Sequence, residues 1–242
     1  MSLQVQVSAS EGALTNRLVC SRGHARVQIE TSPVMRGTVH PVRRMQTQPA
    51  VQEEFGFAQI QVLDFADLYA GKLAAALSRQ HPRDLFDLGP VLDGDRLDGS
   101  LWRTALVYLT SNSKPISDLL APGEPKNFEE TFERQFRGMT RSGTSVEALL
   151  DIRTRTLERV AELMDESCVA FLESVEQEAP DFALIGLPQA ADLPATRRKL
   201  QNLLRRSDEK RQLDRRNLAA ALTQLAARFH KRAGGDHENG RE

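Results

Sequence analysis

The sequence is poor in cysteine and contains no long apolar run. Its two cysteines, Cys20 and Cys168, form neither a disulfide framework nor a metal-ligand spacing, which favours a reducing setting. The longest apolar run falls far short of a membrane span, and the N-terminal stretch lacks the basic and apolar regions of a secretory signal. We therefore expect a cytoplasmic protein with no membrane partner.

Net charge and several common catalytic motifs are also lacking. The formal charge is −1 over 242 residues, so the chain as a whole has no bulk attraction for nucleic acid. The sequence has no His-x-x-x-His set, no Gly-x-Ser-x-Gly elbow and no Gly-x-x-x-x-Gly-Lys loop. What is present is a globular composition, 40% hydrophobic and 27% charged, with enough length to bury a core.

The spacing of apolar residues changes once along the chain. Period-two alternation in LQVQV, RLVC, ARVQIE and AQIQVL predicts strands within residues 1–62, with a further short edge strand near 38–42. From Asp64 onward the period is 3.6, and we expect helices at 64–78, 83–92, 100–111, 127–139, 145–177, 195–206 and 208–230.

Strands followed by helices alone predict an α+β fold, in which a small sheet-bearing lobe leads into an all-helical lobe. We expect an α+β domain at residues 1–95, a helical domain at 96–232 and a disordered polar tail at 233–242.

The stretch DLYAGKLAAALSRQHPRDLFDL, residues 67–88, carries two cations on an apolar helix face. Phe65 and Leu68 belong to one stripe at 100° per residue, and Lys72 and Arg79 fall within it or at its edge. Either their alkyl stems pack while the charges reach solvent, or a buried anion pairs with them. Because only 6 of the 32 basic residues are lysine, Lys72 favours a role for a compact point charge.

Carboxylates in the next predicted helix and on a strand are candidate partners. Pro82 fits the first helical position, which places Asp84 and Asp87 on one face; they could equally serve the helix dipole alone. Glu30 lies on the polar face of ARVQIE, where a carboxylate is either solvated or part of a metal-binding set.

The stretch from residue 67 to 88, with IQVLDF before it and PDFALIGLPQAADLPATRRKLQNLLR downstream, resembles the AbiEii/AbiGii group of nucleotidyltransferase-like toxins. The family pattern is an extended segment, a helix with a Glu/Asp-Leu-x-x-x-Lys-Leu core, then Arg-Asp-x-x-Asp-Leu. The resemblance covers roughly residues 15–230. It implies a polymerase-β-like nucleotidyltransferase lobe in a component of a toxin–antitoxin or abortive-infection system.

The resemblance also implies roles for individual residues. Lys72 would be catalytic and contact the triphosphate of an NTP, with Arg79 and Arg83 nearby. Asp84 and Asp87 match the two aspartates of the family motif and would be catalytic. Glu30 matches a carboxylate-bearing strand and would help to bind Mg²⁺.

The family's phosphate-binding glycine turn and its Asp-x-Asp metal pair are missing where they are expected. Only 23 residues precede the strand at 24–31, and they contain no aspartate. Gly99 and Ser100 are not followed by a carboxylate, and SGTS at 142–145 lies far downstream. Metals and hydrogen-bond donors at the reacting phosphate supply most of the catalysis in such enzymes. We therefore expect a chain that is truncated at its N-terminus and catalytically incomplete as it stands.

A basic C-terminal segment leaves two functions open. From Ala195 to Arg232 the sequence has twelve Lys or Arg against three acids, which is typical either of a polyanion-binding surface or of a solvated helix face. The four arginines expected to contact nucleic acid are Arg205, Arg206, Arg215 and Arg216. The first hypothesis is nucleotide transfer from an NTP to a macromolecular acceptor, with RNA expected. The second is a non-catalytic protein that binds nucleic acid or a partner such as a cognate antitoxin.

Overall fold

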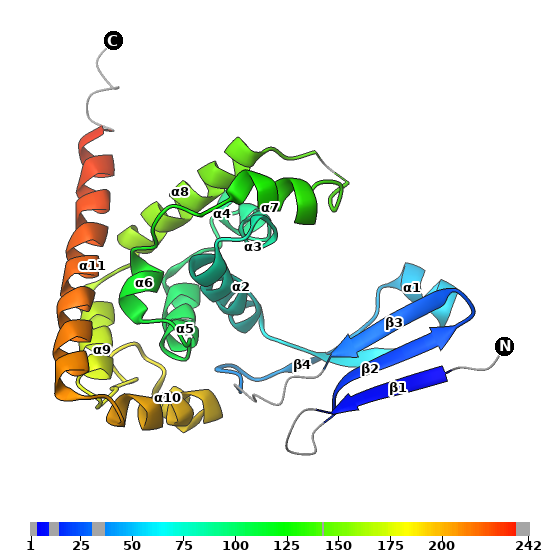
Figure 1. Ribbon diagram of the computed structural model, residues 1–242, viewed down its shortest axis with the longest axis horizontal. Helices are drawn as coiled ribbons and strands as arrows, with labels where there is room; N and C mark the ends of the chain where they lie inside the picture. The colour runs from blue at the N-terminus through cyan, green and yellow to red at the C-terminus, as the bar shows by residue number, and fades with distance from the viewer. Residues whose placement is uncertain (1–3, 10–14, 31–36, 142, 236–242) are drawn as a thin grey trace, which may run out of the picture. The chain divides into compact units, whose positions relative to one another are not determined.

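The computed structural model describes residues 4–9, 15–30, 37–141 and 143–235 (Figure 1). The chain forms two compact units, residues 1–37 and 38–242. Within the described ranges, no helix is long and apolar enough to cross a membrane.

The first unit contains a three-stranded antiparallel sheet in the order β1-β2-β3. Its strands are β1 (Gln4–Ala9), β2 (Thr15–Arg22) and β3 (Ala25–Glu30). Val5, Cys20 and Val27 lie opposite one another across the three strands. Since successive side chains of a strand point to opposite faces, the period-two pattern gathers apolar residues on one face. The three strands predicted in this region are confirmed.

The second unit begins with a two-stranded antiparallel sheet. It consists of β4 (Arg43–Gln46) and β5 (Gln59–Val62), and their connection contains α1 (Pro49–Phe55). β5 confirms the strand predicted in AQIQVL. The edge strand expected at 38–42 was misplaced: pairing begins only at Arg43, because Pro41 has no N–H to donate to a ladder. The sequence did not predict α1.

Helices make up the remainder of the second unit, and the predicted α+β class with a helical lobe is confirmed. They are α2 (Phe65–Arg79), α3 (Pro82–Phe86), α4 (Gly89–Asp93), α5 (Gly99–Thr110), α6 (Ile116–Leu120), α7 (Phe128–Gln135), α8 (Val146–Glu162), α9 (Glu166–Glu176), the 3₁₀ helix η1 (Pro188–Asp192), α10 (Pro194–Leu204) and α11 (Asp208–Gly235). The disordered tail expected at 233–242 was wrong for its first three residues, which belong to α11, and residues 236–242 lie outside the described residues.

Two of the predicted helices are interrupted. The stretch 145–177 forms α8 and α9, because the Asp165 side chain accepts a hydrogen bond from Cys168 N at 2.8 Å and caps a new helix. The stretch 83–92 forms α3 and α4, with Pro90 in the first turn of α4, a position typical of a helix start.

The core of the second unit is centred on α5. This helix packs against α2, and Leu73, Trp102 and Leu106 are fully buried there. The long helix α11 runs along α6, α8 and α9 (Figure 1). The sequence placed a domain boundary at residues 95 and 96, which falls between two helices that share this core; the contacts divide the chain between Gly37 and Thr38.

Candidate functional site

Helix α2 presents Lys72 and Arg79 on one side. The helix begins where the Asp64 side chain accepts a hydrogen bond from Ala66 N at 3.0 Å, and it ends at Gln80, whose backbone is left-handed. The two cations are seven residues apart, which is close to two helical turns. Both therefore lie over the short helix α3 that follows.

Lys72 forms an ion pair with Asp87. Its Nζ lies 2.6 Å from Asp87 Oδ2, and the two side chains are 31% and 36% exposed. The prediction that Lys72 lies within reach of Asp84 or Asp87 is confirmed. A pair with this much exposure is screened by water, so its contribution to stability is small.

Arg79 forms a two-pronged ion pair with Asp84. Nε lies 2.9 Å from Oδ2 and Nη2 2.7 Å from Oδ1. Asp84 is buried, whereas Arg79 is exposed and covers it from the solvent side. His81 caps α3 by accepting from Arg83 N, and the Arg83 side chain is exposed. We refer to Lys72–Asp87 and Arg79–Asp84 as the α2–α3 pairs; their roles in nucleotide binding and catalysis stay predictions.

A buried carboxylate in the first turn of α2, Asp67, was missed by the sequence reasoning. It accepts hydrogen bonds from Val39 N at 2.8 Å, His40 N at 2.9 Å and the Tyr108 hydroxyl at 2.8 Å. Three donors satisfy a fully buried carboxylate, and they fix residues 39 and 40 on α2. An acidic residue in a first helical turn is so common that the sequence offered no signal of this role.

No group of three His, Cys, Asp or Glu side chains that could hold a metal ion occurs within the described part of the chain. A magnesium ion bound together with a nucleotide takes only one or two protein carboxylates besides phosphate oxygens and waters. Asp84 and Asp87 are each engaged with a cation. Glu30 ends β3 opposite Arg17, and its side chain lies outside the description.

Arg206, one of the four predicted nucleic-acid contacts, is instead part of a buried charge cluster. Its Nη1 lies 2.6 Å from Glu176 and 2.8 Å from Asp214, and Lys210 Nζ lies 2.8 Å from the other Asp214 oxygen. We call Glu176, Arg206, Lys210 and Asp214 the α9–α11 cluster. Because its guanidinium is held between two carboxylates, Arg206 is not free to bind phosphate.

The other three predicted contacts are exposed. Arg205, Arg215 and Arg216 face solvent, although Arg215 Nε also donates to Glu176 O at 3.2 Å. Acids outside the basic segment neutralise part of its charge: Asp192 pairs with Arg197, and Glu178 with Arg211. The local charge is therefore smaller than the sequence count suggests.

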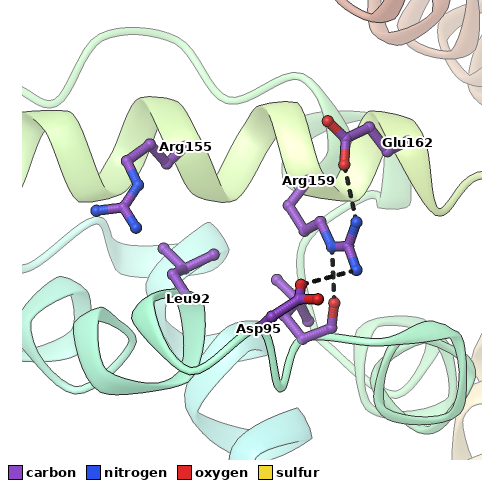
Figure 2. A pocket seen from close by; sticks show the side chains of 6 residues that line it. Leu92, Asp95, Arg155, Arg159 and Glu162 are labelled. Atoms are coloured by element: carbon purple, nitrogen blue, oxygen red, sulfur yellow. Dashed lines mark hydrogen bonds and ion pairs between the residues drawn. The ribbon is translucent and has the colours of Figure 1, made fainter.

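A pocket of about 160 Å³ lies against α8 (Figure 2). Its lining residues are Leu92, Asp95, Leu97, Arg155, Arg159 and Glu162. Arg159 is paired with Glu162 at 2.9 Å and with Asp95 at 3.2 Å, and Arg155 with Asp93 at 2.7 Å. Both guanidinium groups are paired with carboxylates, as Lys72 and Arg79 are, but the sequence motif that resembles the family does not include them.

Comparison with known proteins adds one finding to this geometry. The family model described as nucleotidyl transferase AbiEii toxin, type IV TA system, matches residues 3–224 of the 242. No curated protein and no solved structure matches the chain.

Proposed function

Because the chain belongs to the AbiEii nucleotidyl transferase toxin family, we propose that it binds a nucleoside triphosphate and transfers a nucleotide to a macromolecular acceptor, with RNA as the expected acceptor. In this role it is the toxin of a type IV toxin–antitoxin pair, and a cognate antitoxin opposes it.

The observation that supports this proposal is the pairing of Lys72 and Arg79 with aspartates of α3. The carboxylates hold both cations in place before a ligand arrives, which lowers the cost of ordering them on binding. Phosphate oxygens then compete with Asp87 for the lysine, and Arg79 offers a planar fork that suits phosphate. Lys72, Arg79 and the exposed Arg83 would thus share the negative charge of the triphosphate.

Mg²⁺, which the resemblance implies, stays a prediction, as does a contribution of Glu30 to its site. The proposed contacts of Lys72, Arg79 and Arg83 with the triphosphate do not depend on the metal ion. Asp84 and Asp87 are each paired with a cation, so either would have to exchange that partner in order to bind a metal ion.

A second candidate function is non-catalytic binding of nucleic acid. It is favoured by Arg205 and Arg216, which are exposed on α10 and α11 and lie in the basic segment. Such a surface would contact phosphates without reading sequence.

Nucleotide binding and nucleotide transfer are best measured separately, because the glycine turn and the Asp-x-Asp pair are missing from the 23 residues before the strand at 24–31, where the family pattern expects them. Binding of ATP, GTP, CTP and UTP is measured by calorimetry, and transfer of labelled nucleotide to total RNA by gel assay, with and without Mg²⁺. We expect Lys72→Ala to weaken NTP binding by about tenfold, the equivalent of about 1.4 kcal/mol.

The matched control is Lys126→Ala, which removes an exposed lysine that lies outside α2 and α3. Unchanged NTP affinity in Lys72→Ala would contradict the proposed site. Transfer that Lys72→Ala abolishes would support the enzyme, whereas NTP-independent binding of RNA without transfer would favour the second candidate.

A further inference from the structure

Arg153, on α8, is a buried arginine whose partners are mostly uncharged. Only 7% of the residue is exposed. Nε donates to Gln80 Oε1 at 2.6 Å, and Nη2 donates to the carbonyl oxygens of Gly123 at 2.9 Å and Pro122 at 3.2 Å. Glu124 lies 3.5 Å from Nη1 but is 85% exposed, so it is a weak counter-ion. Burial accordingly lowers the pKa of Arg153.

Stability alone does not explain a charge at this position. A buried charge has a desolvation cost that well-packed apolar residues avoid, and replacing buried charges by apolar side chains is often neutral or stabilising. Apolar side chains of Leu77, Leu85 and Leu157 already line the small cavity beside Arg153. What the guanidinium adds is a fixed set of directional hydrogen bonds to Gln80 and to the loop at 122–123.

Gln80 is the residue that joins the two halves of the candidate site. It follows Arg79 at the end of α2 and precedes His81, the cap of α3. Its backbone has φ 51° and ψ 36°, a left-handed conformation that is unfavourable for a residue other than glycine. The side chain is held at both ends, because its Nε2 donates to Gly123 O at 2.9 Å while Oε1 accepts from Arg153.

We infer that Arg153 is a positioning residue for the α2–α3 pairs. By holding Gln80 in its left-handed conformation, Arg153 sets the direction in which α3 leaves α2. That direction brings Asp84 to Arg79 and Asp87 to Lys72. Its importance for nucleotide binding rests on the proposed function, whereas its effect on the α2–α3 turn does not.

The effect on the turn is tested in the full chain without ligand, by amide hydrogen exchange of residues 78–88. Arg153→Met keeps the length and the packing of the side chain but removes its donors. We expect exchange in this segment to become about ten times faster. The control is Arg155→Met on the same helix, whose partners Asp93 and Asp151 both lie outside residues 78–88, and it should leave the exchange of that segment unchanged.

A rescue variant separates positioning from general packing. Glycine adopts the left-handed conformation without strain, so Gln80→Gly should restore slow exchange in the Arg153→Met background. If the double variant exchanges as fast as Arg153→Met, then Arg153 only packs α8 against residues 122–124 and the inference is overturned. Should Arg153→Met fail to fold, Arg153→Lys, which keeps the charge but loses the fork, takes its place in both measurements.

Nucleotide affinity provides the second readout. Binding groups that are held in place before the ligand arrives lower the cost of ordering them, so we expect ATP binding to weaken by about tenfold in Arg153→Met and to recover in the Gln80→Gly double variant. Unchanged affinity with faster exchange would show that the turn does not control the site. If the unmodified chain binds no nucleoside triphosphate, the proposed function fails, while the exchange measurement still decides whether Arg153 holds the turn.

Discussion

The α2–α3 pairs and the α9–α11 cluster contain the same kinds of side chain in different surroundings. Lys72 and Asp87 are each about one-third exposed, at 31% and 36%. Arg206, Glu176 and Asp214 are 12%, 7% and 8% exposed. A charge in water can change partners at small cost, whereas a buried charge that loses its partner is left without compensation. Exposure therefore distinguishes the cations of the two sites, because Lys72 and Arg79 are 31% and 58% exposed and Arg206 only 12%, whereas Asp84, at 7%, is as buried as Glu176.

Helix order explains why the two sites differ. The α2–α3 pairs lie on a short helix directly after α2, so water reaches them from one side. The α9–α11 cluster joins the last residue of α9 to Arg206 in the turn after α10 and to Asp214 on α11, and these three side chains are at most 12% exposed. We expect substitutions at the two sites to differ in the size and the kind of their effects.

The largest effect on stability should come from Arg206→Ala. The substitution leaves Glu176 and Asp214 buried beside each other without the guanidinium that joins them. We expect the free energy of unfolding, measured in urea at pH 7, to fall by about 3–5 kcal/mol. Arg205→Ala, at the exposed neighbouring position, should change it by less than about 0.5 kcal/mol. Equal effects of the two substitutions would remove the distinction between the sites.

A smaller loss is expected for Arg79→Ala, because Asp84 is buried but Arg79 is not. Loss of the two-pronged bond leaves one buried carboxylate unsatisfied, which should cost about 1–3 kcal/mol. The double variant Arg79→Ala/Asp84→Ala should recover part of this loss. Denaturation curves of both single variants and the double variant form a cycle, and additive effects would mean that the two side chains do not interact.

Lys72→Ala should reduce the free energy of unfolding by no more than about 1 kcal/mol, since Asp87 remains partly in water. The same substitution is expected to weaken nucleotide binding. Thermal melts with and without ATP measure both effects in one experiment: the unliganded midpoint should barely move, and the ATP-induced rise should shrink. A large fall in the unliganded midpoint would place Lys72 among the structural residues.

Nucleic-acid binding should depend on the exposed arginines and not on Arg206. If Arg205 and Arg216 each contact one phosphate of a single strand, Arg205→Ala/Arg216→Ala should lower the slope of log affinity against log salt by about 1.4. Arg134→Ala/Arg137→Ala is the control, because Arg134 on α7 and Arg137 just after it are already paired with glutamates of that helix. Equal slopes for all three proteins would mean that the basic segment serves solubility alone.

The smallest effect on stability is expected at Asp165, which forms an exposed ion pair with Arg103 and whose contribution depends on pH. Hydrogen bonds from Ser167 Oγ and Cys168 N, with the charge of Arg103, hold the pKa of Asp165 well below its ordinary value of 3.8. Its contribution is complete above the unfolded pKa and is lost as the pH falls through the folded pKa. Because asparagine caps a helix about as well as aspartate, Asp165→Asn removes mainly the negative charge at the start of α9, and we expect it to lower the free energy of unfolding by about 0.3–1 kcal/mol at pH 7, and by less below pH 3.8. A difference that does not change with pH would contradict this account.

Predictions from the sequence were accurate where the signal is local. Period two identified four strands, and period 3.6 identified α2 and α5, because burial of one face repeats at each turn or pleat. Lys72 and Asp87 are only 15 residues apart in sequence, so their proximity could be predicted from two consecutive helices. Helix ends were less predictable: a capping side chain at Asp165 interrupts a pattern that otherwise continues.

The sequence by itself determined the fold class, the family and the charged residues that follow one another on α2 and α3. Only the tertiary structure decided that Arg206 is held by Glu176, 30 residues earlier, and that Arg153 holds Gln80, 73 residues earlier. The physical reason is that a charge count along the chain registers neighbours in sequence, whereas the free energy of a charge depends on which groups the packed helices place around it and on how much water they exclude.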